Sequence, residues 1–130
     1  MRQQLKFRGF SNETKSWHYG HGWFEIDYTD EYLKEKGINQ QAMLYTEGYP
    51  VECELSSIGQ YTGLNDASDE EVYEGDILLD TFLDDCYEVV WDDYGMFLYC
   101  KKGGNEGIDR HEFEEQVSLF VVSGNIYNLV

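Results

Sequence analysis

The sequence predicts a mainly β protein of the α+β class: a small curled antiparallel sheet or an SH3-like barrel with one or two short helices. Aromatic residues make up 16% of the chain, with 11 Tyr, and such side chains favour strands. The 13 Gly and the single Pro are typical of strands joined by glycine turns. Short apolar runs recur at regular spacing with turn residues between them, as in small antiparallel barrels.

Length and composition indicate one domain over residues 1–130. A compact chain of 130 residues buries enough apolar surface for one core without disulfides or a metal. Its hydrophobic content of 42% is well above that of disordered chains, although its net charge is high. The sequence contains no internal repeat, linker or low-complexity tract.

Strands are predicted where apolar residues alternate or cluster between turn residues. Leu5–Phe10 alternates and predicts a first strand, and an aromatic-rich segment over Trp17–Phe24 predicts a return strand broken at Gly20 and Gly22. Two runs around the turn Asp92–Gly95 predict the clearest hairpin. The remaining predicted strands and the two arms of that hairpin are Ala42–Tyr45, Val51–Leu55, Ile58–Leu64, Val72–Leu79, Tyr87–Trp91, Met96–Cys100 and Val117–Val122.

Two short helices are predicted from capping signals. Thr29 or Asp30 is expected to cap a helix over Glu31–Glu35, and Gly37 is a typical residue just past a helix end. A second helix of one or two turns is expected over Asp109–Gln116, with its first residue near the cap.

The charge of the chain is concentrated in its middle. The 26 acids and nine Lys plus Arg give a net charge of −17. Gly37–Cys100 contains 15 of the acids and no Lys or Arg, whereas Met1–Lys36 contains six of each sign and Lys101–Val130 five acids and three bases. Such a segment repels the phosphates of nucleic acids, whose binding depends on Lys and Arg. We therefore expect no direct binding to DNA or RNA.

The sequence favours a cytoplasmic location. No apolar stretch follows the N-terminal charges as in a signal peptide, and no run approaches the roughly 18 apolar residues of a membrane span. Cys53, Cys86 and Cys100 are odd in number and contain no C-x-x-C pair, so we expect three reduced and mostly buried thiols rather than a disulfide framework or a zinc site.

A histidine metal site is not favoured. His18 and His21 are the nearest approach to a metal motif, and His111 adds a third imidazole. Residues three apart in a strand point to opposite faces, so the first two converge only if the chain turns at Gly20. Polar loop residues are the simpler interpretation.

The acids also lack the pattern of a metal or catalytic site. No D-x-D-x-D-G loop with a distal Glu is formed by Asp80, Asp84, Asp85, Asp92 and Asp93. We expect these residues to be solvated acids in turns. The sequence contains no G-x-S-x-G motif and no phosphate-binding glycine loop. We therefore predict no catalytic, metal-binding or cofactor-binding residue and no cofactor. A metal-dependent enzyme using the middle carboxylates is the least favoured alternative.

Three sequence blocks resemble a known family. The chain contains an opening strand at Leu5–Phe10, a central block of two parts and a closing block. Their order is the one found in the YopX family of phage and prophage proteins, which the chain resembles. The chain departs from the family over residues 29–49 and in its short tail. The matching residues of the central and closing blocks are Gln60, Tyr61, Thr62, Gly63, Leu64, Tyr73, Glu74, Gly75, Asp76, Gly124, Asn125, Ile126 and Tyr127.

The resemblance implies a temperate phage or prophage gene, and hence the cytoplasm of a bacterial host. It implies no catalytic residue, cofactor or substrate. The blocks themselves have a structural interpretation, because Gly63 and Gly75 can adopt a positive φ and Asp76 can accept hydrogen bonds from nearby backbone N–H groups.

The acidic segment carries the functional expectation. Its aromatic anchors and carboxylates suit a non-enzymatic module that binds a basic host or phage protein, with no membrane partner. The alternatives are that the acids only keep the domain in solution, or that the protein is a structural, self-assembling phage protein whose strand edges form a homo-oligomer. The candidate partner-binding residues are Asp84, Asp85, Trp91, Asp92, Asp93 and Tyr94.

We predict that the purified protein binds neither duplex nor single-stranded nucleic acid at physiological salt, because 15 acids lie in a stretch with no base. A gel-shift titration to micromolar protein checks this. A shifted band that persists after divalent ions are removed would show the prediction to be wrong.

Overall fold

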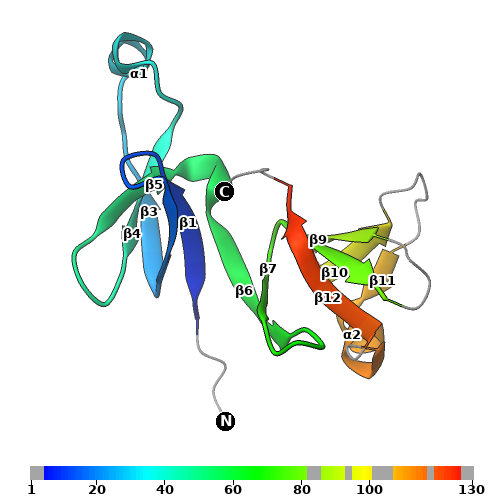
Figure 1. Cartoon of the computed structure of the whole chain (residues 1–130). Coiled ribbons are helices and arrows are strands. Elements are labelled where there is room, and N and C mark those ends of the chain that lie inside the picture. The colour runs from blue at the N-terminus through cyan, green and yellow to red at the C-terminus, as the bar shows by residue number, and fades with distance from the viewer. Residues whose placement is uncertain (1–4, 82–85, 93–94, 101–106, 117–118, 127–130) are drawn as a thin grey trace. The chain divides into compact units, whose positions relative to one another are not determined.

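The computed structural model describes residues 5–81, 86–92, 95–100, 107–116 and 119–126 (Figure 1). The described chain is mainly β, with a curled antiparallel half-barrel sheet and two short helices, which confirms the predicted fold class. It divides into two compact units, the first ending at Gln60 and the second beginning at Tyr61. The expectation that both belong to one folding domain stays a prediction.

The first unit begins with the predicted hairpin. Strand β1 (Phe7–Ser11) pairs antiparallel with β2 (Ser16–Gly20), in a register that runs from Phe7↔Gly20 to Ser11↔Ser16. The other edge of β1 pairs with the first residues of β6 (Gly59–Asn65), which follows the short 3-10 turn η1 (Leu55–Ser57).

A three-stranded antiparallel sheet completes the first unit, in the order β3-β4-β5. Its strands are β3 (Gly22–Glu25), β4 (Gln41–Tyr45) and β5 (Val51–Glu54). The break predicted at Gly20 and Gly22 is confirmed, because β2 pairs with β1 while β3 pairs with β4. The bend needs a glycine, since a Cβ at Gly20 would lie 2.2 Å from the carbonyl oxygen of Tyr45.

Helix α1 (Asp30–Lys36) forms where the capping signals predict it. The side chain of Thr29 accepts a hydrogen bond from the Tyr32 N–H at 3.1 Å, and Gly37 ends the helix with a φ of 67°. Leu33 is its one buried side chain. Neither helix of the described chain approaches the length needed to cross a bilayer.

Tyr28 links the approach to α1 with the sheet. Its hydroxyl donates to a Glu52 carboxylate oxygen at 2.8 Å, and its ring stacks on that of Tyr32 with centroids 4.5 Å apart. The hydrogen bond to Glu52, with desolvation as a second cause, raises the pKa of Tyr28 to about 12. The hydroxyl therefore remains a donor at neutral pH.

The interior of the first unit is small and contains both apolar and polar side chains. Phe10, Ala42, Leu44 and Cys53 are buried, which agrees with the expectation of a reduced, buried thiol at Cys53. Burial raises the pKa of this thiol to about 11, and nearby Glu52 adds to the shift. At neutral pH the side chain is therefore protonated and packs as a small hydrophobic group.

The second unit contains a five-stranded antiparallel sheet in the order β11-β10-β9-β8-β12. The later residues of β6 pair separately with a short strand, β7. The elements of the second unit after β6 are β7 (Glu71–Tyr73), β8 (Asp76–Asp80), β9 (Cys86–Asp92), β10 (Gly95–Cys100), β11 (Gly107–Asp109), helix α2 (Arg110–Gln116) and β12 (Phe120–Asn125).

The predicted β9–β10 hairpin and helix α2 are confirmed, but three features of the second unit differ from prediction. The single strand predicted over Val72–Leu79 is interrupted at Gly75, whose φ of 90° turns the chain between β7 and β8. Strand β11 was not predicted, because three residues after a glycine-rich stretch give no alternation. Strand β12 extends to Asn125, beyond the predicted end at Val122, since its pairing with β8 continues past an irregularity in the register.

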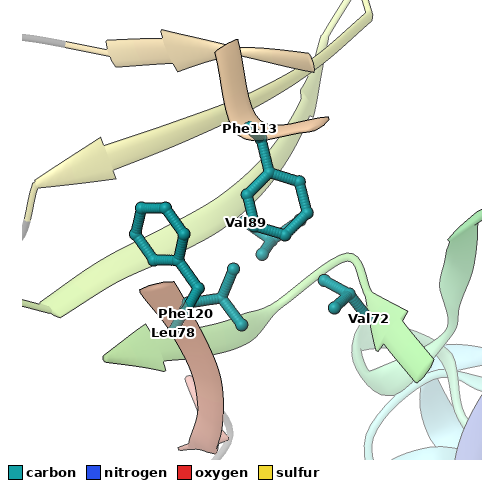
Figure 2. Close-up of a cluster of buried hydrophobic side chains, with 5 residues drawn as sticks. All are labelled: Val72, Leu78, Val89, Phe113 and Phe120. Atoms are coloured by element: carbon teal, nitrogen blue, oxygen red, sulfur yellow. The ribbon is translucent and has the colours of Figure 1, made fainter. Parts of the chain in front are cut away.

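One cluster of buried side chains holds the second unit together (Figure 2). Phe113 from α2 and Phe120 from β12 lie with their ring centroids 5.4 Å apart, over side chains of β7, β8 and β9. Burying each such side chain contributes about 1.5–3 kcal/mol. The cluster consists of Val72, Leu78, Val89, Phe113 and Phe120.

We expect Gly75→Val to destabilise the protein by on the order of 1 kcal/mol or more, because a β-branched residue is strained at a φ of 90°. Thermal melting measures the change. Gly124→Val is the matched control, since Gly124 lies in a strand of the same unit without a positive φ and a Cβ there meets nothing within 4 Å. Equal melting temperatures for the two variants would contradict a strained turn at Gly75.

Candidate functional site

The first unit carries an open groove of about 630 Å³. Its walls come from β2, from the residue before β1 and from the turn after β4. The lining residues are Lys6, Trp17, His18, Tyr19, Gly20, His21, Thr46, Glu47 and Gly48.

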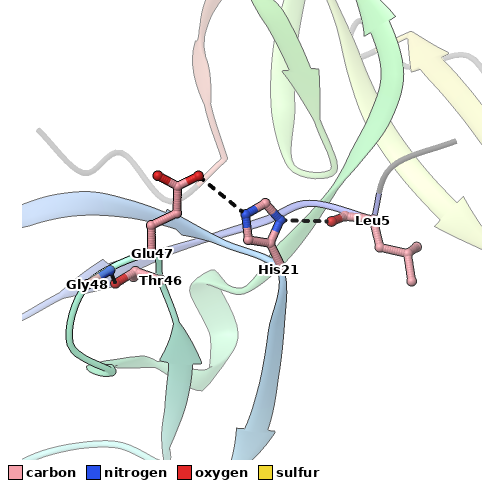
Figure 3. A network of polar contacts seen from close by, with 5 residues as sticks. All are labelled: Leu5, His21, Thr46, Glu47 and Gly48. Atoms are coloured by element: carbon pink, nitrogen blue, oxygen red, sulfur yellow. Dashed lines mark hydrogen bonds and ion pairs between the residues drawn. The ribbon is translucent and has the colours of Figure 1, made fainter.

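His21 lies between Leu5 and Glu47 (Figure 3). Its Nδ1 is 3.4 Å from the Leu5 carbonyl oxygen and its Nε2 is 3.9 Å from a Glu47 carboxylate oxygen. A carbonyl oxygen only accepts, so Nδ1 is the donor in this contact. Both side chains are largely exposed, so the ion pair formed by protonated His21 contributes little stability.

His18 contacts hydroxyl groups near the start of the hairpin's return strand and not His21. Its Nε2 lies 2.8 Å from Thr14 Oγ1 and 3.3 Å from Ser16 Oγ. No group of three or more His, Cys, Asp or Glu that could hold a metal ion occurs among the residues that the structure describes. His111 belongs to α2 of the second unit.

Two cations near the groove lie over aromatic rings. The Arg8 guanidinium carbon is 4.6 Å from the Trp17 ring centroid, and Lys6 Nζ is 5.8 Å from that of Tyr19. Arg8 is buried, whereas Tyr19 is exposed. The groove therefore offers imidazoles, one lysine and aromatic surface.

The acids of the second unit fall into two classes. Asp66, Asp76 and Asp80 are buried, so these carboxylates are part of the fold and not of an outer surface. Others are exposed, at the turn before β7 and along α2. The exposed acids of the described second unit are Asp69, Glu70, Glu112, Glu114 and Glu115.

Asp66 accepts three backbone hydrogen bonds. Its Oδ1 accepts from the N–H groups of Ser68 and Glu70, both at 2.8 Å, and its Oδ2 accepts from the Val122 N–H at 2.7 Å. The first two bonds close the turn before β7. The bond to Val122 of β12 was missed, because no local signal shows which distant strand a carboxylate will reach.

Asp76 has a similar role at the β7–β8 turn. Its Oδ2 accepts from the Tyr73 N–H at 2.8 Å, as expected for an aspartate that bonds nearby backbone. In the sheet, Asp76 lies opposite Asn125, and the Ile126 N–H donates to the Gly75 carbonyl at 2.8 Å. The structure thus brings the central and closing sequence blocks together.

The other residues of the family-like blocks also serve pairing and packing. Tyr61 lies opposite Tyr73 with ring centroids 5.4 Å apart, and Thr62 Oγ1 donates to the Val72 carbonyl at 2.8 Å. Gly63 has the expected positive φ, 83°, in β6. Of the remaining block residues, Gln60 pairs with β1, Leu64 packs against the core, Glu74 lies in the β7–β8 turn, Gly124 lies in β12 and Tyr127 lies outside the described residues.

The predicted partner-binding residues are placed only in part. Trp91 and Asp92 lie at the end of β9, opposite Met96 and Gly95 of β10. Asp84, Asp85, Asp93 and Tyr94 lie outside the described residues. A common surface for these six residues therefore stays a prediction.

Comparison with known proteins identifies one family. The family model described as YopX protein matches residues 6–129. No curated protein matches the chain.

Replacing Asp66 with Ala should destabilise the protein by on the order of 3 kcal/mol, because hydrogen bonds to a charged group contribute about 1.5–3 kcal/mol each and the Val122 N–H loses its acceptor. Denaturant unfolding measures the loss. Glu70→Ala removes an exposed acid of the same turn and should leave stability within about 0.5 kcal/mol. Similar losses for both variants would show that the Asp66 carboxylate is not the anchor.

Proposed function

Because the chain belongs to the YopX family, we propose that it is a non-enzymatic accessory protein of a phage or prophage that binds a basic host or phage protein in the bacterial cytoplasm. The second unit provides the binding surface through its exposed carboxylates. The partner is recognised by its positive charge, with aromatic side chains as anchors.

The distribution of charge between the two units supports this function. Residues 61–129 contain 17 acids and three Lys or Arg, whereas residues 1–60 contain nine acids and six bases. Folding accounts for the three buried carboxylates of the second unit. The exposed acids lie at the turn before β7 and, for three of them, on α2.

A surface of this charge acts mainly on the approach of a partner. Carboxylates attract a basic protein from a distance, which raises the association rate, and salt screens the attraction over about 8 Å at physiological ionic strength. The same field repels nucleic acids. Basic proteins are therefore the class of partner that this unit favours.

The two other hypotheses receive less support. A metal-dependent enzyme would need converging ligands, and the buried Asp66 and Asp76 instead accept backbone hydrogen bonds. A self-assembling structural protein would need strand edges that pair between copies, and this role leaves the concentration of acids in the second unit unexplained.

We predict that changing Glu112, Glu114 and Glu115 of α2 to Gln slows association with the basic partner by roughly threefold to tenfold and flattens its dependence on salt. Gln keeps the length and helix propensity of Glu, so the fold is retained. The partner is first recovered by pull-down from a bacterial lysate at low and high salt, and surface plasmon resonance then measures the rates.

The matched control removes three exposed charges from the first unit, through Glu13→Gln, Glu31→Gln and Glu35→Gln. It should change the rate less than the α2 variant does. If both variants bind with the rate and salt dependence of the original protein, the acids only keep the protein in solution and the proposed function is wrong.

A further inference from the structure

Strand β3 is an open edge of the first unit's three-stranded sheet. In the described part of the chain, β3 pairs with β4 on one side and with no strand on the other. The Ile26 N–H donates to the Gln41 carbonyl at 2.9 Å, one step beyond the last pair of the ladder. Because alternate residues of an antiparallel strand bond to opposite sides, Trp23 and Glu25 direct their N–H and C=O groups away from β4.

Large aromatic side chains surround this edge. Trp23 is 39% exposed, Phe24 46% and Tyr45 49%, and the rings of the last two lie with centroids 5.7 Å apart. Phe24 and Tyr45 share one face of the sheet, because Phe24 lies opposite Met43, two residues from Tyr45 in β4. An unpaired edge beside exposed aromatic groups is a template for another strand.

The geometry points to a second copy of this chain as the occupant, with β3 pairing antiparallel to β3 of the other copy around a two-fold axis at Phe24. Trp23 then lies opposite Glu25 of the second copy, and the outward N–H and C=O groups of these residues form four backbone hydrogen bonds. Phe24 meets Phe24 of the second copy. The result is a continuous six-stranded sheet.

The residues of this edge are compatible with self-pairing, which favours a second copy over a foreign strand. In this register Glu25 faces an aromatic residue and not another acid. Glu25 is the one acid of β3, so this pairing sets no two carboxylates opposite each other. The edge also belongs to the part of the chain with nearly balanced charge, nine acids and six bases over residues 1–60.

The dependence on ionic strength distinguishes this self-association from the binding of a basic partner by the acidic unit. Two copies of net charge −17 repel one another, and salt screens the repulsion, so the dimer should strengthen as ionic strength rises. Binding of a basic partner should weaken under the same change. Either proposal can therefore fail while the other stands.

We expect sedimentation equilibrium to show a monomer–dimer equilibrium that shifts toward the dimer with protein concentration and with salt. Phe24→Lys should raise the dissociation constant about tenfold or more, since it removes an aromatic pair and sets like charges opposite each other. Tyr49→Lys is the matched control, because Tyr49 is 90% exposed in the turn after β4, and it should leave the constant unchanged.

Backbone pairing is tested at Glu25. Glu25→Pro removes an outward N–H while leaving the ladder to β4 intact, and proline is tolerated on edge strands. This variant should be monomeric, whereas Glu25→Ala keeps the N–H and should dimerise. Circular dichroism confirms that each variant is folded.

The register is tested by cross-linking, which does not depend on the proline variant folding. Directly opposite residues of a non-hydrogen-bonded pair have Cα atoms about 4.5 Å apart, within the range for a disulfide. Phe24→Cys should therefore form a disulfide dimer under mild oxidation, and Glu25→Cys, which lies opposite Trp23, should not exceed the background of the original protein. A monomer at all concentrations, or equal cross-linking at both positions, would overturn the inference.

Discussion

The carboxylate of Asp66 joins two segments that lie 56 residues apart in the sequence. One oxygen closes the turn before β7 and the other accepts from the backbone of β12, next to the Ala67 N–H that donates to the Phe120 carbonyl. These bonds hold Phe120 over β8 and β9, where it packs on Phe113. A buried carboxylate that accepts three N–H groups is satisfied without a cation, which suits a segment with no Lys or Arg.

Hydrogen bonding of buried carboxylates to backbone N–H groups also explains how so acidic a unit folds. Repulsion among carboxylates opposes a compact state, and burial of an unpaired carboxylate opposes it more strongly. The second unit buries Asp66 and Asp76 against backbone donors and leaves the acids of α2 at the surface. The exposed charge is therefore a feature added to the fold, and this is why we assign it to partner binding.

The two units present surfaces of different chemistry. The first combines a groove of imidazole and aromatic groups with strand β3, which pairs on one side only in the part of the chain that the structure describes, and its acids and bases are nearly balanced. The second has an apolar interior and an acidic exterior. Self-association through one and capture of a basic protein through the other respond to salt in opposite directions, because screening removes repulsion in the first case and attraction in the second.

Local signals in the sequence determined the β class, the hairpins at β1–β2 and β9–β10, the cap of α1 at Thr29 and the positive φ of Gly75. Each depends on residues a few positions apart. Tertiary structure decided which strands pair at a distance, that Asp66 reaches Val122, and that β3 pairs on one side only within the described residues. It also decided which carboxylates are buried. An aspartate in a turn has the same local sequence whether it faces water or a backbone N–H of a distant strand, so only packing distinguishes an anchor from a binding surface.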